Sequence, residues 1–346
     1  MRTNLAPRRK AQGFTLVELM IALVIGLLVV AAAGSLFLSN RRVYASTESV
    51  NRIQENQRTA FEMMARDIRE AGGNPCSRNL VNMLDTSKPS GSYWTGWMQG
   101  VTGTDGGAGA DDLTLSLANG SSIAVTSADN PSANIGVSSV GSIQPNDIVM
   151  VCNAEVASIF QVTQIDSSGG ISLQHNSGSG NPGNLQKPFQ VDQTTYDSNP
   201  SGNAAGYCFL PGTPANSNCL NKPSGSPAQV VTPYAVRWYI ANNTRGGTSL
   251  YRQRIVNSAP AAADEIAEGV TDMQIKYKFA NAAPFQDANA GWTAAQWTSV
   301  TAIDVALTVR ASAGVMSNRD TQGTGGAVLS RRLEDVVTLR NHLDIQ

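Results

Sequence analysis

Glu18 is the residue whose position most needs a chemical explanation. It is the only charged side chain between Phe14 and Leu38, a run of mostly apolar residues. A carboxylate at the centre of a membrane helix costs about 2.5–3.5 kcal/mol, and less near the interface. Such a charge is tolerated beside a positive group that also satisfies its oxygens. The segment holds no such group, so we expect the partner of Glu18 to be another chain or a charge created by processing.

The cysteines are the second set of reactive side chains. Cys76, Cys152, Cys208 and Cys219 all follow the apolar run, and their even number indicates disulfides in an oxidising compartment. Three pairings are possible. We predict the pair Cys208–Cys219, which closes a short loop and is worth about 2–3 kcal/mol through the entropy of the unfolded chain. That pairing leaves Cys76 with Cys152.

The remaining residues offer little for catalysis or metal binding. The cysteines lack C-x-x-C spacing, and His175 and His342 are expected to be surface residues, so we predict no metal or cofactor. No G-x-S-x-G or H-E-x-x-H occurs, and the glycine-rich stretch 100–109 lacks the Lys and Ser/Thr of a phosphate loop. A net charge of −1 argues against nucleic acid as a primary partner. We therefore expect a protein that is not an enzyme.

The run that carries Glu18 has the length of a membrane span. Residues 19–38 contain no ionisable side chain, and 20 helical residues rise about 30 Å. Residues 1–13 carry four basic residues and no acid, which places the N-terminus in the cytoplasm. A secretory signal has a shorter apolar region and a small-residue cleavage site, so this segment is expected to anchor the chain.

The sequence G-F-T-L-V-E, residues 13–18, resembles the processing site of type IV prepilins and type II secretion pseudopilins. The resemblance implies that a prepilin peptidase cuts between Gly13 and Phe14, removes the leader 1–13 and methylates Phe14. It also implies that Glu18 registers the subunit in a fibre, where it pairs with the Phe14 amine of a neighbour. Removing a leader of charge +4 would take the net charge from −1 to −5.

The helix is expected to continue beyond the span. We predict one helix in two parts, a membrane and fibre-core part at 14–40 and an amphipathic periplasmic part at 41–72, ended by Gly72-Gly73 and Pro75. Apolar residues and one Gln recur at spacings of three and four in the second part, as on a helix face that packs on a core. This stripe consists of Val50, Ile53, Gln57, Phe61, Met64 and Ile68.

Residues 73–346 are predicted to form a β-rich globular domain with an irregular insertion at about 176–232. Alternation in 113–117 and 123–125 around Asn119-Gly120 predicts a hairpin. Further strands are expected at 148–151, 159–165, 171–174, 234–240, 249–255, 272–279 and 300–310, with a final strand or short helix at 333–339. Short gaps between strands favour an antiparallel sheet, covered on one face by the amphipathic half-helix. The predicted fold class is α+β, of the type IV pilin kind.

The C-terminal part is similar to the PilW family of type IV pilus minor pilins. The resemblance is carried by segments 147–149, 160–162, 237–240, 250–252, 268–270 and 339–341, with Met273, Tyr277, Trp297 and Val300. It implies a structural subunit that primes pilus assembly and lies in or near the fibre tip. The implied partners are other minor pilins, the major pilin, the prepilin peptidase and the inner-membrane assembly platform.

The resemblance places the chain in the inner membrane, with its C-terminal domain in the periplasm, before assembly and in the extracellular fibre afterwards. It implies a role in twitching motility, adhesion or DNA uptake. Two alternatives remain open: a J-type minor pseudopilin of a type II secretion system, and a membrane-anchored periplasmic ligand-binding or adhesive module.

Overall fold

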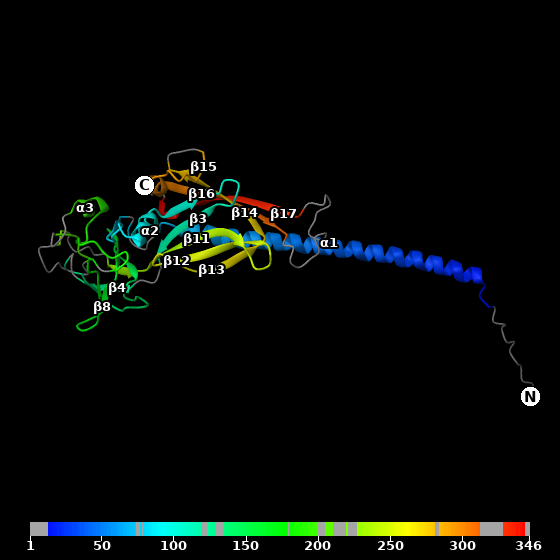
Figure 1. Ribbon diagram of the computed structural model, residues 1–346, viewed down its shortest axis with the longest axis horizontal. Helices are drawn as coiled ribbons and strands as arrows, with labels where there is room; N and C mark the ends of the chain where they lie inside the picture. The colour runs from blue at the N-terminus through cyan, green and yellow to red at the C-terminus, as the bar shows by residue number, and fades with distance from the viewer. Residues whose placement is uncertain are drawn as a thin grey trace, which may run out of the picture.

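The molecule is elongated, because one long helix leaves a β-rich body and continues alone toward the N-terminus (Figure 1). The architecture is α+β, as the sequence predicts. The computed structural model describes residues 13–73, 77, 79–118, 123–128, 130, 134–178, 180–199, 205–209, 219–220, 227–280, 284–311 and 328–342.

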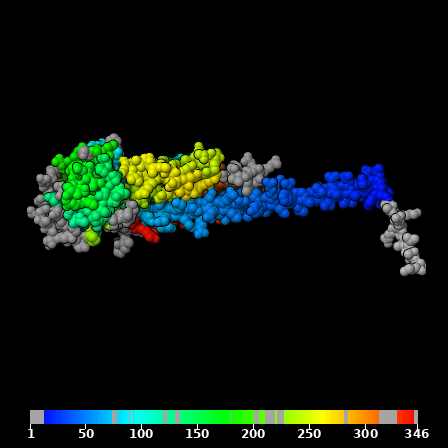
Figure 2. Space-filling view, turned by 90° about the horizontal axis from the view of Figure 1, so that it is seen from below, coloured from blue at the N-terminus to red at the C-terminus, as the bar shows by residue number. Residues whose placement is uncertain are grey.

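Helix α1, Leu16–Glu70, contains 55 residues. Thr15 is its N-cap, and Gly72 follows its end at a φ of +67°, a backbone conformation that favours glycine. The helix therefore begins and ends close to the predicted limits. Its first half projects from the body, and its second half runs along one side of it (Figure 2).

Two antiparallel sheets of the described residues pack with the second half of α1. One has the strand order β13-β12-β11-β3-β2 and the other the order β15-β14-β16-β17. The first comprises β2 (Val101–Thr104), β3 (Asp112–Ala118), β11 (Pro233–Asn242), β12 (Thr248–Val256) and β13 (Ala259–Glu268). The second comprises β14 (Val270–Phe279), β15 (Gln286–Asp287), β16 (Val300–Arg310) and β17 (Ser330–Thr338).

A shared apolar core holds α1 and these two sheets together. Ile53, Met64 and Ile68 of the helix are buried against side chains from both sheets, among them Trp238 of β11 and Leu307 of β16. Burying a large apolar side chain stabilises the fold by about 1.5–3 kcal/mol. The amphipathic half of the helix is therefore fixed in place by the sheets that it covers.

Gly269 is the point at which the chain changes sheets. It separates β13 from β14 and has a φ of +82°. Its N–H donates to the carbonyl of Thr248 at 2.9 Å, and its own carbonyl accepts from the N–H of Arg310 at 2.8 Å. A Cβ at this position would lie 2.4 Å from the Arg310 carbonyl oxygen. Only glycine fits this turn without displacing the backbone.

A third sheet lies at the end of the molecule farthest from the N-terminus (Figure 1). In the described residues its order is β1-β7-β6-β10-β4-β5-β9-β8, antiparallel except between β1 and β7. Its strands are β1 (Leu80–Asn82), β4 (Ile123–Ser127), β5 (Ile135–Val137), β6 (Ile148–Cys152), β7 (Ala157–Gln161), β8 (Gln164–Asp166), β9 (Ser172–Gln174) and β10 (Gln229–Val231).

All of these strands except β1 lie between Ala118 and Pro233, which are paired neighbours in β3 and β11. We call this part of the chain the inserted module. It has its own core, in which rings of Phe160, Phe189 and Phe209 pack edge to face at centroid distances of 5.9 and 5.3 Å. The module therefore extends from the adjoining ends of two neighbouring strands of the first sheet.

Three short helices are present in the described part of the body: α2 (Pro89–Trp97), α3 (Gln193–Ser198) and α4 (Ala294–Thr298), with a 3-10 turn at Arg340–His342. Helix α2 covers the second face of the third sheet with Trp94 and Trp97. The indole N–H of Trp97 also donates to the Tyr234 carbonyl at 2.8 Å, which ties α2 to β11.

The predicted hairpin around Asn119-Gly120 is wrong, although both strands exist. β3 pairs with β2 and β11, whereas β4 pairs with β5 and β10. Both sides of each strand are taken by other strands, and the turn residues lie outside the described part. The predicted strand 159–165 is divided into β7 and β8, and β8 pairs with β9, which is the predicted strand 171–174.

The expected irregular insertion at 176–232 is only the last part of the inserted module. Phe189, Tyr196, Tyr207 and Phe209 from this stretch are buried. Both histidines, which were expected at the surface, are half-buried. His175 packs 4.8 Å from the Phe189 ring, and the Nδ1 of His342 lies 2.8 Å from the Val300 carbonyl oxygen.

Candidate assembly site

The first half of α1 presents a long, unpartnered apolar surface. Every residue from Gly13 to Tyr44 is exposed, and Ala45 is the first buried one. Phe14 is 89% exposed, and Leu, Ile and Val side chains behind it are 54–75% exposed. By its length and composition the helix is able to cross a membrane. A surface of this kind marks a membrane or protein contact.

Glu18 lies in the first turn of this segment, held by the helix cap. One oxygen of its carboxylate, Oε2, accepts from the N–H of Thr15 at 3.0 Å and from the Thr15 hydroxyl at 3.0 Å. The N–H of Glu18 in turn donates to Oγ1 of Thr15 at 3.3 Å. This reciprocal capping box satisfies the start of the helix. Among the described residues, the carboxylate has no positive partner.

Thr15 is a functional neighbour that the sequence reasoning missed. The spacing Thr15-x-x-Glu18 before an apolar run is a recognisable capping-box signature. The structure places Gly13, Phe14 and Glu18 together at the exposed tip of the helix. Residues 1–12 of the predicted leader lie outside the described residues.

The second half of α1 is anchored by a buried charged group. The carboxylate of Asp67 accepts from Nε and Nη2 of Arg252 at 2.7 and 3.2 Å and from the indole N–H of Trp238 at 3.0 Å. The side chains of Asp67 and Arg252 are 10% and 23% exposed. The hydrogen bonds to Asp67 raise the pKa of Arg252 above its ordinary value. This bidentate pair fixes the helix on β11 and β12.

Two amide side chains add further contacts between α1 and the sheets. Asn56 donates to the carbonyl of Glu268 at 2.9 Å. Gln57 lies between β16 and β17, with its amide nitrogen 3.4 Å from the carbonyl oxygens of both Leu307 and Arg331. In the predicted stripe, Ile53, Gln57, Met64 and Ile68 are buried, while Val50 and Phe61 are half-buried.

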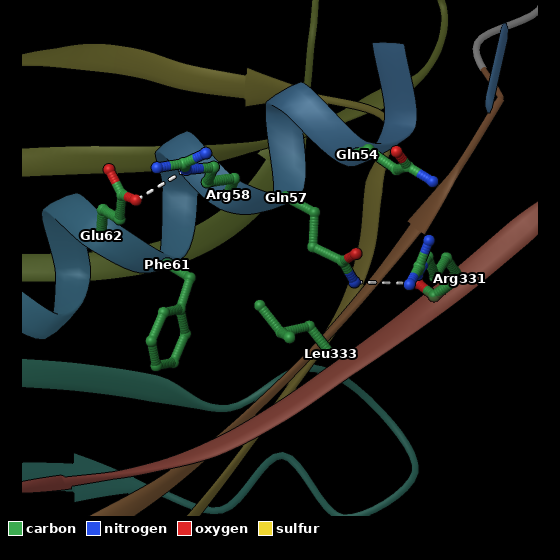
Figure 3. A pocket seen from close by; sticks show the side chains of 7 residues that line it. All are labelled: Gln54, Gln57, Arg58, Phe61, Glu62, Arg331 and Leu333. Atoms are coloured by element: carbon green, nitrogen blue, oxygen red, sulfur yellow. Dashed lines mark hydrogen bonds and ion pairs between the residues drawn. The ribbon is translucent and has the colours of Figure 1, made fainter. Parts of the chain in front are cut away.

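A groove of about 350 Å³ opens beside Gln57, between α1 and β17. Figure 3 shows Phe61 and Gln57 extending from the helix toward Leu333 and Arg331 of the strand. The ion pair between Arg58 and Glu62 lies on its helix side, with a distance of 2.8 Å. The groove is therefore apolar at its centre and charged along its edges.

The cysteines and histidines serve the body of the molecule. Cys208 and Cys219 form a disulfide with Cα atoms 5.5 Å apart, as predicted. Cys152 is also disulfide-bonded, but Cys76 lies outside the described residues, so the pair Cys76–Cys152 stays a prediction. In the described part of the chain, no group of three or more His, Cys, Asp or Glu residues is placed to hold a metal ion.

Comparison with known families agrees with this geometry. The family model of the prokaryotic N-terminal methylation motif matches residues 8–34, which include Gly13, Phe14 and Glu18. The family model of type IV pilus-assembly protein W matches residues 237–341, from β11 to the end of the second sheet. No curated protein and no solved structure matches the chain. The two matched segments are the exposed part of the helix and most of the two sheets that hold its second half, and over these segments the chain is similar to type IV pilus minor pilins of the PilW family.

Proposed function

We propose that this minor pilin primes assembly of a type IV pilus and occupies a position in or near the fibre tip. The observation that carries the proposal is the first half of α1, an exposed apolar helix whose only charge up to Leu38 is Glu18. Such a helix has two favourable environments, a bilayer before assembly and a bundle of like helices afterwards. The body is left to contact other minor pilins and the major pilin.

Processing at Gly13 fits the position of the capping box. Cleavage after Gly13 would leave Phe14 as a methylated N-terminus one residue before Thr15, close to the cap but outside it. The amine of Phe14 in one subunit and Glu18 in the next would then neutralise each other in the fibre core. The prepilin peptidase and the inner-membrane assembly platform are the implied partners of this step.

The proposed orientation in the membrane follows from the same N-terminal segment. A leader with four basic residues would hold the N-terminus in the cytoplasm, and the body would fold in the periplasm, where its disulfide can form. The similarity of residues 237–341 to PilW favours a pilus over a type II secretion pseudopilus. Motility, adhesion and DNA uptake would follow from the fibre, and we propose no enzymatic activity.

Replacement of Glu18 tests this assignment. We expect Glu18→Gln to be processed and inserted in the membrane but to enter sheared fibres poorly, because the neighbouring amine loses its counter-charge. Glu48→Gln is the matched control, since Glu48 forms only an exposed ion pair with Arg52 on the same helix. Equal amounts of both variants in the fibre fraction would contradict the proposed role of Glu18.

A further inference from the structure

We propose that the free edge of β17 and the groove beside it form a docking site for an extended segment of a partner pilin subunit. The partner strand would pair with β17 and place alternate side chains in the groove. This inference rests on the proposed function, because it supplies a contact between subunits of one fibre. It adds a surface on the body to the exposed helix.

The edge of β17 is long and regular. It is the last strand in the order β15-β14-β16-β17, and nine consecutive residue pairs join it to β16 without a bulge. In the described residues no strand lies on its other side. Unpaired edges are the usual places where one chain adds a strand to the sheet of another. The opposite edge of the sheet is β15, which has only two residues.

The hydrogen-bond pattern shows which backbone groups face outward. The N–H of Ala311 donates to the Leu329 carbonyl, and that of Leu339 donates to the Thr301 carbonyl, both at 2.9 Å. These bonds continue the register of β16 and β17, so odd-numbered residues of β17 turn their backbone groups toward β16. The even-numbered residues therefore present N–H and C=O groups at the free edge: Ser330, Arg332, Glu334, Val336 and Thr338.

One of these outward groups is already occupied. The N–H of Val336 donates to Oδ1 of Asp335 at 2.8 Å. Arg332 and Glu334 pair with each other through their side chains at 3.1 Å, which leaves their backbone groups available. The usable part of the edge is thus centred on Arg332 and Glu334.

The groove lies where the side chains of an added strand would point. Arg331 and Leu333, which turn their side chains toward α1, form one wall, and five residues of one helix face form the other (Figure 3). Because alternate residues of a strand share a face, an added strand would direct every second side chain into this space. Phe61 and Leu333 favour an apolar residue there.

The charges of the groove indicate an acidic neighbour for that apolar residue. Arg58 already pairs with Glu62 at 2.8 Å. In the described residues the guanidinium of Arg331 has no ion-pair partner, and the residue lines the groove. An acidic side chain in the docked segment would complete this pair.

Continuity with the exposed helix points to a pilin as the owner of that segment. Stepping back from Phe61 by three and four residues follows one stripe of α1 through Arg58 and Gln54 to Tyr44 and Phe37. Tyr44 and Phe37 are 72% and 70% exposed. A subunit whose helix packs on this stripe has its body next to the groove of β17.

Site-specific photocrosslinking in cells that produce the full chain tests the proposal. The crosslinking amino acid is placed at Arg332 or Glu334 and, as the control, at Gln286 on the opposite edge of the same sheet. We expect crosslinks from the first two positions, well above the control, to an extended segment of a different pilin subunit, mapped by mass spectrometry. Crosslinks to a second copy of this chain or to a protein outside the pilin class would overturn the proposal, as would none above the control.

Two variants, each with its own control, show whether the edge and the groove are both used. Glu334→Pro removes an outward N–H but no bond to β16, whereas Glu334→Ala keeps that N–H and loses the same ion pair. Gln54 is exposed, so Gln54→Trp fills the groove from outside the core, and Gln54→Ala leaves it open. The Pro and Trp variants should reduce crosslinking from Arg332 to the level of Gln286, and both Ala variants should keep it.

The outcomes separate this inference from the proposed function. If the Pro and Trp variants both crosslink like wild type, the docking site is wrong, even if the chain is processed and enters fibres normally. If the Pro variant fails to fold, the Trp variant alone decides. If the wild-type chain is absent from fibres, the proposed function fails, while crosslinks formed in the membrane still report on the β17 edge.

Discussion

Asp67 shows how a single side chain can decide where α1 is held. Its carboxylate lies under the sheet and receives three hydrogen bonds from Arg252 and Trp238. From the sequence, Asp67 is one of many charged residues along the helix, and nothing distinguishes it from Glu62 or Arg66. Only the register between helix and sheet brings a guanidinium to it, so this contact could not be predicted.

We expect Asp67→Asn to lower the free energy of unfolding by about 3 kcal/mol, because it leaves Arg252 buried without a counter-charge. Glu70→Gln is the control, since its ion pair with Arg66 is 55% and 78% exposed and should contribute at most about 1 kcal/mol. Denaturant titration of the detergent-solubilised full chain measures both. Equal losses in the free energy of unfolding would show that the buried pair stabilises the fold no more than the exposed pair does.

Asp304 gives a prediction about pH. In the described residues its Oδ1 is buried without a hydrogen-bond partner, and burial, together with nearby Glu334, raises the pKa of the carboxyl above 3.8. An acid whose pKa rises on folding destabilises the folded state when ionised. The wild-type protein should therefore gain stability as the pH falls through the raised pKa.

Replacing the acid by an amide of similar size tests the predicted direction of this change of stability with pH. Asp304→Asn should be more stable than wild type at pH 7, and the difference should vanish near pH 3.8, the ordinary pKa of the group. A variant that is less stable than wild type at pH 7 would contradict the assignment.

At the scale of elements, the spacing of apolar residues predicts where helices and strands lie, because local sequence determines these limits. The limits of α1, its buried stripe and the strands β11, β12, β14, β16 and β17 follow from apolar spacing and glycine, and the structure confirms them. Strand β13 was not predicted, because Ala259–Glu268 is rich in Ala and has Ile266 as its only large apolar residue. Partner choice did not follow, because β3 and β4 have equally good alternation but different sheets. The prepilin-like motif identifies Phe14 and Glu18, whereas the Thr15 cap is indicated by a different signal, a Thr three positions before Glu18.

Gly269 provides a test at this scale, since it joins β13 to β14 across two sheets. Gly269→Ala should cost about 3 kcal/mol or more, because the Cβ would meet the Arg310 carbonyl oxygen at 2.4 Å in addition to the strain of a φ of +82°. Gly246→Ala is the matched control, with a φ of +81° and nothing within 4 Å, and should cost about 1 kcal/mol. Thermal unfolding compares them, and equal losses would remove the steric argument.

In the described residues the apolar side chains form three buried clusters. One joins α1 to the two sheets of the body, a second fills the inserted module at the far end (Figure 1), and a third lies between α2 and the third sheet. The disulfide Cys208–Cys219 belongs to the module. Changes in the module should therefore leave the docked helix intact, so the module can vary without loss of the assembly surface.

Removing the disulfide tests this independence. Replacing Cys208 and Cys219 by Ser should destabilise the module by about 2–3 kcal/mol. Hydrogen exchange should become faster in the module, for example at Val230, while amides of the docked helix, for example at Met64, stay protected. Faster exchange at both places would show that the two cores unfold as one unit.

The N-terminus of the chain in sheared pili is the most direct test of its proposed role as a processed fibre subunit. Mass spectrometry of that fraction should find a mature chain that begins with N-methylated Phe14 and lacks residues 1–13. A chain that still begins with Met1, or that stays in the membrane and is absent from the fibre fraction, would contradict the account.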